Sequence, residues 1–308
     1  MNTTEHHPDR RAAITGTLCL LAQPTAAAAQ ETAVSGVRDD GGGRLTTPVS
    51  LNGGWPLRFA VDSAANASVI ASDLLEPLGL TISGTAEVNT LIARETVQVT
   101  AVNHIDAGAV ARDDTRLMVA DRSGLGGVDG LLGTDVLAGS RLIMQFERRR
   151  MRIARSRTSG GYMFSEGRSQ LRYRAPAEQR FTNLMMIEGM AGSIPFRAIL
   201  DTGARISIIN RVMAEAIGAR PIVLNSGRRT QDVLSPTGLS QQAEAMMASH
   251  IGFAGVSLRQ TPVLVGDFHV FDLWGLSRQP AMLMGVDILG RFRTVSIDLK
   301  RGELLLET

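Results

Sequence analysis

Cysteine is almost absent from this sequence. The only one, Cys19, lies near the N-terminus, so the rest of the chain has no thiol for disulfide bonds, metal ligation or nucleophilic catalysis. Histidines are few as well, namely His6, His7, His104, His250 and His269. Their spacings are not those of metal ligands. The glycine-rich residues 124–130 lack the last glycine of a dinucleotide-binding loop. No metal or cofactor is therefore expected.

Lysine and aromatic residues are also scarce. Lys300 is the only lysine, and aromatic residues make up 4% of the chain, so a core must be mainly aliphatic. The net charge is only +2, and the arginines do not form a basic face, so we expect no nucleic-acid partner. The densest basic run, residues 148–150, is followed by apolar residues that alternate with arginine. This pattern predicts a solvated hairpin.

Long hydrophobic runs are missing too. A modest apolar run follows Arg10 and Arg11 and ends in a stretch of small residues up to Ala29. The run is too short to span a membrane, and its layout is that of an export signal. We therefore expect residues 1–29 to be a cleaved export signal and the polar, glycine-rich residues 30–44 to be a mobile leader. The protein is then expected in a bacterial periplasm or secreted, without a stable membrane span.

What the sequence does contain is an internal repeat. In residues Ala198–Ile209 an apolar run ends in Asp201, and residues Arg58–Ile70 repeat this pattern around Asp62, 139 positions earlier. Both copies have proline six residues before the aspartate, arginine four before it and serine six after it. The residues that follow the aspartates are Ser63 and Ala64 in the first copy and Thr202 and Gly203 in the second. Such a duplication predicts two similar lobes.

A second pair of repeated segments follows further along each half. Each has two apolar residues before a glycine, and an aspartate two residues later. These residues are Leu131, Leu132, Gly133 and Asp135 in the first half and Leu283, Met284, Gly285 and Asp287 in the second. Each half then ends in a charged hairpin pattern, which extends the repeat over most of the chain.

Short apolar segments recur between turn signals from Leu45 onward, and this pattern is typical of an all-β protein. Two short helices are expected, one starting at residues 71–75 with Ser72 as its N-cap and one over residues 211–217 that ends at Gly218. The composition of residues 156–161 indicates a linker. The predicted organisation is a first lobe at residues 45–157, a linker at 158–169 and a second lobe at 170–308.

On these residues the sequence resembles aspartic peptidases of the pepsin and retropepsin type, closest to bacterial retropepsin-like proteins with two tandem lobes. The resemblance implies the two-lobed acid-protease fold, in which each lobe supplies one aspartate and an apolar-apolar-glycine segment braces it. Asp62 and Asp201 would then share one proton and activate a water for hydrolysis of a polypeptide substrate. The protein is expected to act as a monomer.

The resemblance also implies roles around the aspartates. Ser63 and Thr202 would brace them by hydrogen bonds, and Gly203 would allow a close backbone approach. Ala64 stands where the family has glycine. Two alternatives therefore stay open: a non-catalytic protein of this fold that binds a peptide or a partner, and a peptidase active only as a dimer of second lobes.

Two further expectations follow from the resemblance. Hairpin flaps are expected at residues 87–110 and between residues 223 and 247. The flap tyrosine of pepsins has no counterpart, because Tyr162 and Tyr173 are the only tyrosines. Ala65 and Ala204 lie where pepsin-like relatives commonly carry a hydroxyl residue, so the active pH range is expected to be higher than in a pepsin.

Overall fold

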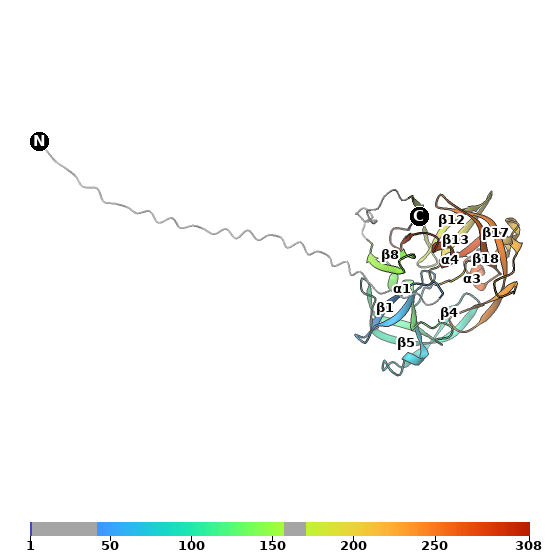
Figure 1. Ribbon diagram of the computed structural model, residues 1–308. Helices are drawn as coiled ribbons and strands as arrows, with labels where there is room; N and C mark the ends of the chain where they lie inside the picture. The colour runs from blue at the N-terminus through green and yellow to red at the C-terminus, as the bar shows by residue number, and fades with distance from the viewer. Residues whose placement is uncertain (2–41, 157–170) are drawn as a thin grey trace. The chain divides into compact units, whose positions relative to one another are not determined.

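The computed structural model describes Met1 and residues 42–156 and 171–308 (Figure 1). The predicted export signal, all of the predicted leader before residue 42, and the predicted linker lie outside the described residues, so the domain boundaries stay predictions. In the described parts of the chain, strands dominate and the helices are short. None of these helices is long and apolar enough to cross a bilayer.

Strands of the first half form a seven-stranded sheet in the order β1-β2-β7-β3-β6-β5-β4. They are β1 (Thr46–Leu51), β2 (Leu57–Val61), β3 (Val69–Ala71), β4 (Ile82–Asn89), β5 (Arg94–Asp106), β6 (Ala111–Ala120) and β7 (Gly130–Leu132). The 3-10 helix η1 (Ser72–Leu74) follows β3, and α1 (Thr134–Leu137) follows β7. β2 delivers Asp62 from a buried position, because Phe59, Ala60 and Val61 are fully shielded from water.

Strands of the second half form a nine-stranded sheet in the order β11-β12-β13-β19-β14-β18-β17-β15, with β16 paired to β17 (Figure 1). They are β11 (Glu178–Arg180), β12 (Leu184–Ala191), β13 (Ile194–Leu200), β14 (Ile208–Ile209), β15 (Arg220–Pro221), β16 (Thr230–Leu234), β17 (Ser240–Phe253), β18 (Val256–Val265) and β19 (Ala281–Met284). The helices of this half are α2 (Arg211–Ala216), α3 (His269–Leu273) and α4 (Val286–Leu289).

A third sheet combines strands of both halves, in the order β10-β21-β20-β8-β9. Its strands are β8 (Ser140–Gln145), β9 (Arg150–Arg155), β10 (Arg172–Pro176), β20 (Thr294–Asp298) and β21 (Glu303–Glu307). β8 and β20 pair antiparallel, with Met144 opposite Val295. Both side chains belong to one buried apolar cluster that extends into the two larger sheets. The two halves therefore share a backbone ladder and a core.

The predicted repeat is visible in the strand pairing. β2 runs parallel to β7, with Val61 opposite Leu132. β13 runs parallel to β19, with Leu200 opposite Met284. The apolar-apolar-glycine segments thus lie beside the strands that end in the two aspartates, and the predicted mostly β fold with two similar halves is confirmed.

One of the two predicted helices is confirmed and the cap of the other is wrong. α2 lies where it was expected. The Asn210 side chain caps it by accepting a hydrogen bond of 2.9 Å from the Met213 N–H, and Gly218 ends it with a φ of +60°. The predicted cap at Ser72 is wrong. Ala71 takes the N-cap position of η1, and the Ser72 hydroxyl donates to Asp121 at 3.2 Å instead. The arginines at 148–150 are exposed at the turn between β8 and β9, as predicted.

Candidate active site

Asp62 and Asp201 each follow directly on a buried strand, β2 and β13. The Asp62 N–H donates to the Leu132 carbonyl at 3.0 Å, and the Asp201 N–H donates to the Met284 carbonyl at 2.9 Å. Both aspartates are therefore fixed to the segment that the sequence repeat places beside them. Parallel pairing holds these two backbone positions in matching surroundings.

Each carboxylate is hydrogen bonded to the turn that follows it. Asp201 Oδ1 accepts from the N–H groups of Gly203 at 2.8 Å and Ala204 at 2.9 Å. Asp62 Oδ1 accepts from the Ala64 N–H at 2.9 Å. Ala64 departs from the family glycine but keeps the amide-to-carboxylate bond of that turn.

The two aspartate turns approach each other closely at Gly203. A Cβ atom built there would lie under 3.0 Å from the Asp62 carboxyl group, a distance that real Cβ atoms essentially never show. The Asp62 carboxyl group therefore lies against the backbone of the second turn. Any side chain at residue 203 would displace the Asp62 carboxyl group, which explains why this position is a glycine.

The hydroxyls beside the aspartates link the two halves. Ser63 Oγ donates to the Leu200 carbonyl and Thr202 Oγ1 donates to the Val61 carbonyl, each at 2.7 Å. Each hydroxyl also accepts at 3.1 Å from the backbone N–H of the other residue. Ser63 and Thr202 are buried, so these four bonds form out of water and hold the two turns in register.

A second set of hydrogen bonds ties each aspartate turn to the apolar-apolar-glycine segment beside it. The sequence had assigned no role to the serines that form these bonds. The Ser68 hydroxyl donates to Asp135 at 2.7 Å and accepts from the Gly133 N–H at 3.0 Å. In the second half the Ser207 hydroxyl donates to Asp287 at 2.6 Å and accepts from the Gly285 N–H at 2.9 Å. The serine that follows each aspartate by six residues was the sequence signal for these bonds.

The brace residues are tightly packed. A Cβ atom at Gly133 would lie 2.9 Å from the Ala65 carbonyl oxygen, and one at Gly285 would lie 2.8 Å from that of Ala204. The apolar members of the two brace segments are all buried: Leu131, Leu132, Leu283 and Met284. Only glycine fits between this apolar layer and the aspartate turn.

The surroundings raise the pKa of both carboxyl groups. For Asp62, burial raises the pKa, and the Ala64 N–H and the charge of Arg44 oppose that rise. For Asp201, burial raises the pKa well above its ordinary value, and the negative charge of Asp62 raises it further. The pair therefore holds a proton at a pH where an isolated aspartic acid would be ionised.

Arg44 is a site residue that the sequence did not reveal. It lies at the end of the predicted leader, yet it is only 7% exposed, and its guanidinium donates to the Leu125 carbonyl at 2.6 Å. Its positive charge acts on the pKa of both Asp62 and Asp201. No repeat or motif marks this position.

Two hairpin tips are linked to each other by hydrogen bonds. Residues 90–93 connect β4 to β5, and residues 235–239 connect β16 to β17. The Glu95 carboxylate links the tips, because it accepts from the hydroxyls of Thr90 at 2.9 Å and Thr237 at 2.8 Å. Apolar side chains of the first tip join the cluster that contains residues next to the aspartates, namely Leu91, Ile92, Ala64, Ala204 and Ile206.

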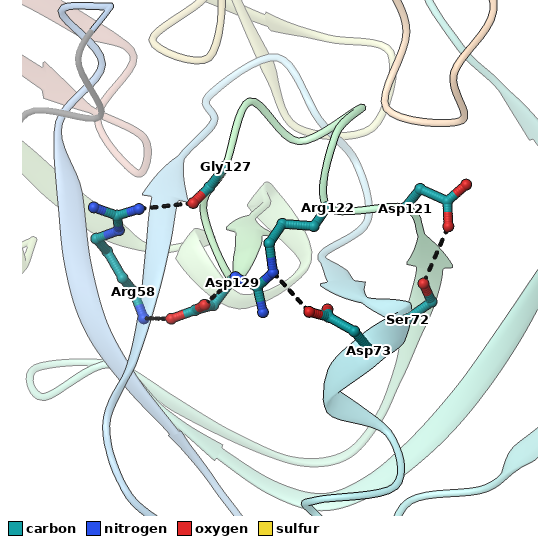
Figure 2. A network of polar contacts seen from close by, with 7 residues as sticks. All are labelled: Arg58, Ser72, Asp73, Asp121, Arg122, Gly127 and Asp129. Carbon is teal, nitrogen blue, oxygen red and sulfur yellow. Dashed lines mark hydrogen bonds and ion pairs between the residues drawn. The ribbon is translucent and has the colours of Figure 1, made fainter.

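The loop between β6 and β7 is anchored by a polar network (Figure 2). The Arg122 guanidinium lies between Asp73, at 2.8 Å, and Asp129. The Arg58 backbone N–H donates to Asp129 at 2.7 Å, and its guanidinium donates to the Gly127 carbonyl at the same distance. The loop that carries the Leu125 carbonyl is thereby fixed to β2 and η1.

The described residues were also compared with the requirements of a metal site and of a second binding cavity. In residues 42–156 and 171–308, no group of three or more His, Cys, Asp or Glu side chains is placed to hold a metal ion. A cavity of about 630 Å³ lies in the second half, lined by residues of β12, β13 and the turn after β17, but no aspartate turn contributes to it.

A family profile described as "Aspartyl protease" matches residues 47–136 and 186–288, more than half of the chain. The chain belongs to the aspartyl protease family. Each matched segment of this family member contains one aspartate turn and one brace, which confirms the resemblance drawn from the sequence. The family implies a hydrolase with a polypeptide substrate.

Solved structures similar to this aspartyl protease family member include one from a bacterium. It is the crystal structure of a retropepsin-like aspartic protease from Rickettsia conorii, with 18% sequence identity and a TM-score of 0.33. The match covers 45% of this chain and 93% of that chain. A comparison with curated proteins gives no match.

Proposed function

We propose that this protein is an aspartic endopeptidase in which Asp62 and Asp201 act as one catalytic pair. The observation that carries the proposal is the contact of the Asp62 carboxyl group with the backbone of Gly203, held by the reciprocal hydroxyl bonds of Ser63 and Thr202. The charge of Asp62 opposes ionisation of Asp201, so the two carboxyl groups do not both ionise easily and share one proton.

Burial raises the pKa of both carboxyl groups, so the pair retains one proton, which lies on Asp201 in the proposed mechanism. Ionised Asp62 then takes a proton from a water molecule as that water attacks the scissile carbonyl carbon. Asp201 donates its hydrogen to the carbonyl oxygen, and a tetrahedral diol forms. Collapse of the diol breaks the C–N bond, and the leaving amine takes the proton that Asp62 received. One diol hydroxyl returns its proton to Asp201 as the new carboxyl group forms, which restores the starting protonation of the pair.

Single-chain action is part of the proposal. Both Ser63 and Thr202 find their hydrogen-bond partners in the opposite half of the same chain. This supports a monomer over a dimer of second halves. The amide of Ala64 still bonds the Asp62 carboxylate, which supports catalysis over a purely binding role.

The test is turnover of an unfolded protein substrate by three variants. Asp62→Asn and Asp201→Asn are each expected to lower kcat by at least about a thousandfold, because either change removes the shared proton chemistry. Asp114→Asn is the matched control, since Asp114 is exposed and its φ of 48° suits asparagine. Full activity in Asp62→Asn would rule out the pair.

We further propose that the protein is exported and that residues 1–29 are removed. The support is the arrangement of Arg10, Arg11, the short apolar run and the small residues before Gln30. Mass spectrometry of the periplasmic fraction should then detect a chain that starts at Gln30. A cytoplasmic product that retains Met1 would contradict this.

A further inference from the structure

A cavity in the second half lies apart from the aspartate turns. It has a volume of about 630 Å³, and its walls are the β12–β13 hairpin, the turn between β17 and β18, and residues 279–280 before β19. Phe196 and Phe253 supply buried apolar walls, and Met190 supplies an apolar side chain that is 46% exposed. A cavity of this size and lining is typical of a site for a small ligand.

The backbone around this cavity is fixed by strand pairing. β12 pairs with β17, with Gly189 opposite Phe253. A Cβ atom at Gly189 would overlap the Phe196 ring, so glycine lets this ring lie against the strand. Ala254 and Gly255 form the turn with φ values of 51° and 80°, the conformation of a tight two-residue hairpin. The cavity is therefore formed before any ligand arrives.

Two opposite charges line the cavity. Glu188 on β12 stands directly opposite Arg197 on β13, and side chains of opposite charge at such positions commonly form a pair. Within residues 42–156 and 171–308, however, neither side chain has an ion pair or a hydrogen bond. Glu188 is exposed and Arg197 is partly buried. Both charged groups are therefore available to a ligand.

The internal repeat shows which contact Arg197 lacks. Its counterpart in the first half is Arg58, whose guanidinium donates to the Gly127 carbonyl at 2.7 Å (Figure 2). The strand register places Gln279 at the position that matches Gly127. The Gln279 carbonyl accepts from the Asn210 side chain at 2.8 Å instead. The second half thus keeps the arginine but uses its acceptor for another contact.

The acidic residue beside that arginine is replaced as well. In the first half, Asp129 accepts from the Arg58 backbone N–H at 2.7 Å (Figure 2). Ala281 stands at the matching position of the second half, where the Arg197 N–H donates to the Pro280 carbonyl at 3.1 Å. An arginine that the first half holds in a polar network therefore lines a cavity in the second.

We infer that this cavity binds a short peptide with free ends, at a site separate from the aspartate pair. The terminal carboxylate of the peptide binds Arg197 through charge-assisted hydrogen bonds, and its terminal ammonium group binds Glu188. An apolar side chain of the peptide packs against Phe196 and Phe253. A ligand with only a carboxylate is repelled by Glu188, and one with only an amine is repelled by Arg197, so a ligand that carries both charges matches the site.

The test is isothermal titration calorimetry of the full chain with the dipeptide leucyl-leucine, its N-acetylated form and its C-terminal amide. Wild type is expected to bind the free dipeptide with a Kd below about 1 mM. Either modification should weaken binding about tenfold or more, because each removes one charge-assisted contact.

The variants assign each end of the peptide to its partner. Arg197→Gln should weaken binding of the free dipeptide about tenfold and bind the amide equally well. Glu188→Gln should likewise no longer distinguish the free dipeptide from its acetylated form. Arg259→Gln, exposed on β18 outside the cavity, is the control and should keep the wild-type Kd. Asp201→Asn should also keep it, because the cavity lies apart from the aspartate turns.

Three outcomes would each overturn the inference. They are no binding of the free dipeptide, equal binding of its free and modified forms by wild type, and loss of binding in Asp201→Asn, which would place the peptide at the aspartate pair. If Arg197→Gln fails to fold, the modified dipeptides decide the question with wild type alone. Catalytic turnover is not measured in this test, so a failure of the proposed peptidase function leaves its result unchanged.

Discussion

Ala65 and Ala204 lie three residues after the two aspartates, and neither has a hydroxyl that could donate to a carboxylate. Burial raises the pKa of Asp62 and of Asp201, so the pair takes up its first proton at a higher pH than exposed aspartates do. Catalysis needs one proton on the pair, so both limits of the active range move upward with these pKa values. We expect a bell-shaped pH profile of kcat/KM centred at about pH 5 to 7.

The variant Ala204→Ser tests the cause of that shift. A serine hydroxyl that donates to Asp201 would stabilise the ionised form and lower its pKa. Asp201 must be protonated for catalysis in the proposed mechanism, so the alkaline limb of the profile should move to lower pH. Ala219→Ser, in a loop away from the aspartates, is the control. A wild-type optimum below about pH 4, or an alkaline limb that stays in place in Ala204→Ser, would contradict this expectation.

For individual residues, the internal repeat predicted the site residues that occur in both halves and missed those that occur in only one half. Ser63 and Thr202 stand at matching positions, so the repeat predicted both partners of the hydroxyl bonds. Arg44 has Leu184 as its counterpart, so the repeat offered no signal. The effect of this arginine depends on a turn that is distant in sequence, and no local pattern encodes that contact.

Among the elements, the two hairpins hold each other closed. Glu95 of β5 bonds Thr237 of the opposite tip, and the Val270 N–H at α3 bonds the Leu91 carbonyl at 3.4 Å. We expect Glu95→Ala to speed amide hydrogen exchange at residues 235–239 by about tenfold, because a hydrogen bond to a charged group contributes about 1.5–3 kcal/mol.

The control for that exchange measurement is Glu87→Ala on the same hairpin. Glu87 forms an ion pair with Arg94 in an exposed position of β4 and β5, and such pairs contribute little to stability. Exchange at residues 235–239 should therefore match that of wild type in Glu87→Ala. Equal exchange in both variants would show that Glu95 does not hold the tips together.

Element positions were predictable where local chemistry decides them. The asparagine cap and Gly218 belong to α2 itself, so the sequence located that helix within one residue. Ser72 was predicted to cap a helix, but its hydroxyl binds Asp121, 49 residues away. The contact between Glu95 and Thr237 spans 142 residues and was equally invisible in the sequence.

For the whole molecule, the sheet shared by both halves predicts mutual dependence. Without β8, the strand β20 would lose one of its two ladder partners, and the buried Val295 and Ile297 would lose contact with Leu142 and Met144. We expect the separate fragments 42–156 and 171–308 to show no cooperative thermal unfolding, and the two expressed together to form a 1:1 complex that melts cooperatively. Circular dichroism and light scattering would measure both properties.

A folded and active second half would instead support a dimer of second halves. If fragment 171–308 alone formed a folded dimer that hydrolyses peptides, catalysis would not need Asp62. Dimerisation would then have to replace the strand pairing of β8 with β20. Such a dimer would contain two copies of Thr202 and Gly203 in place of the mixed pair of turns described for the single chain.

When two similar halves are joined in one chain, matching positions on the two sides of the site can carry different side chains. An enzyme made of two identical subunits must present the same side chain at both ends of its bound peptide. Here Asn66 follows Asp62 by four residues and Arg205 follows Asp201 by four, while the backbone frame around the aspartates stays matched. If the two aspartates are catalytic, such unequal side chains allow the chain to favour one direction of a bound peptide, which identical subunits cannot do.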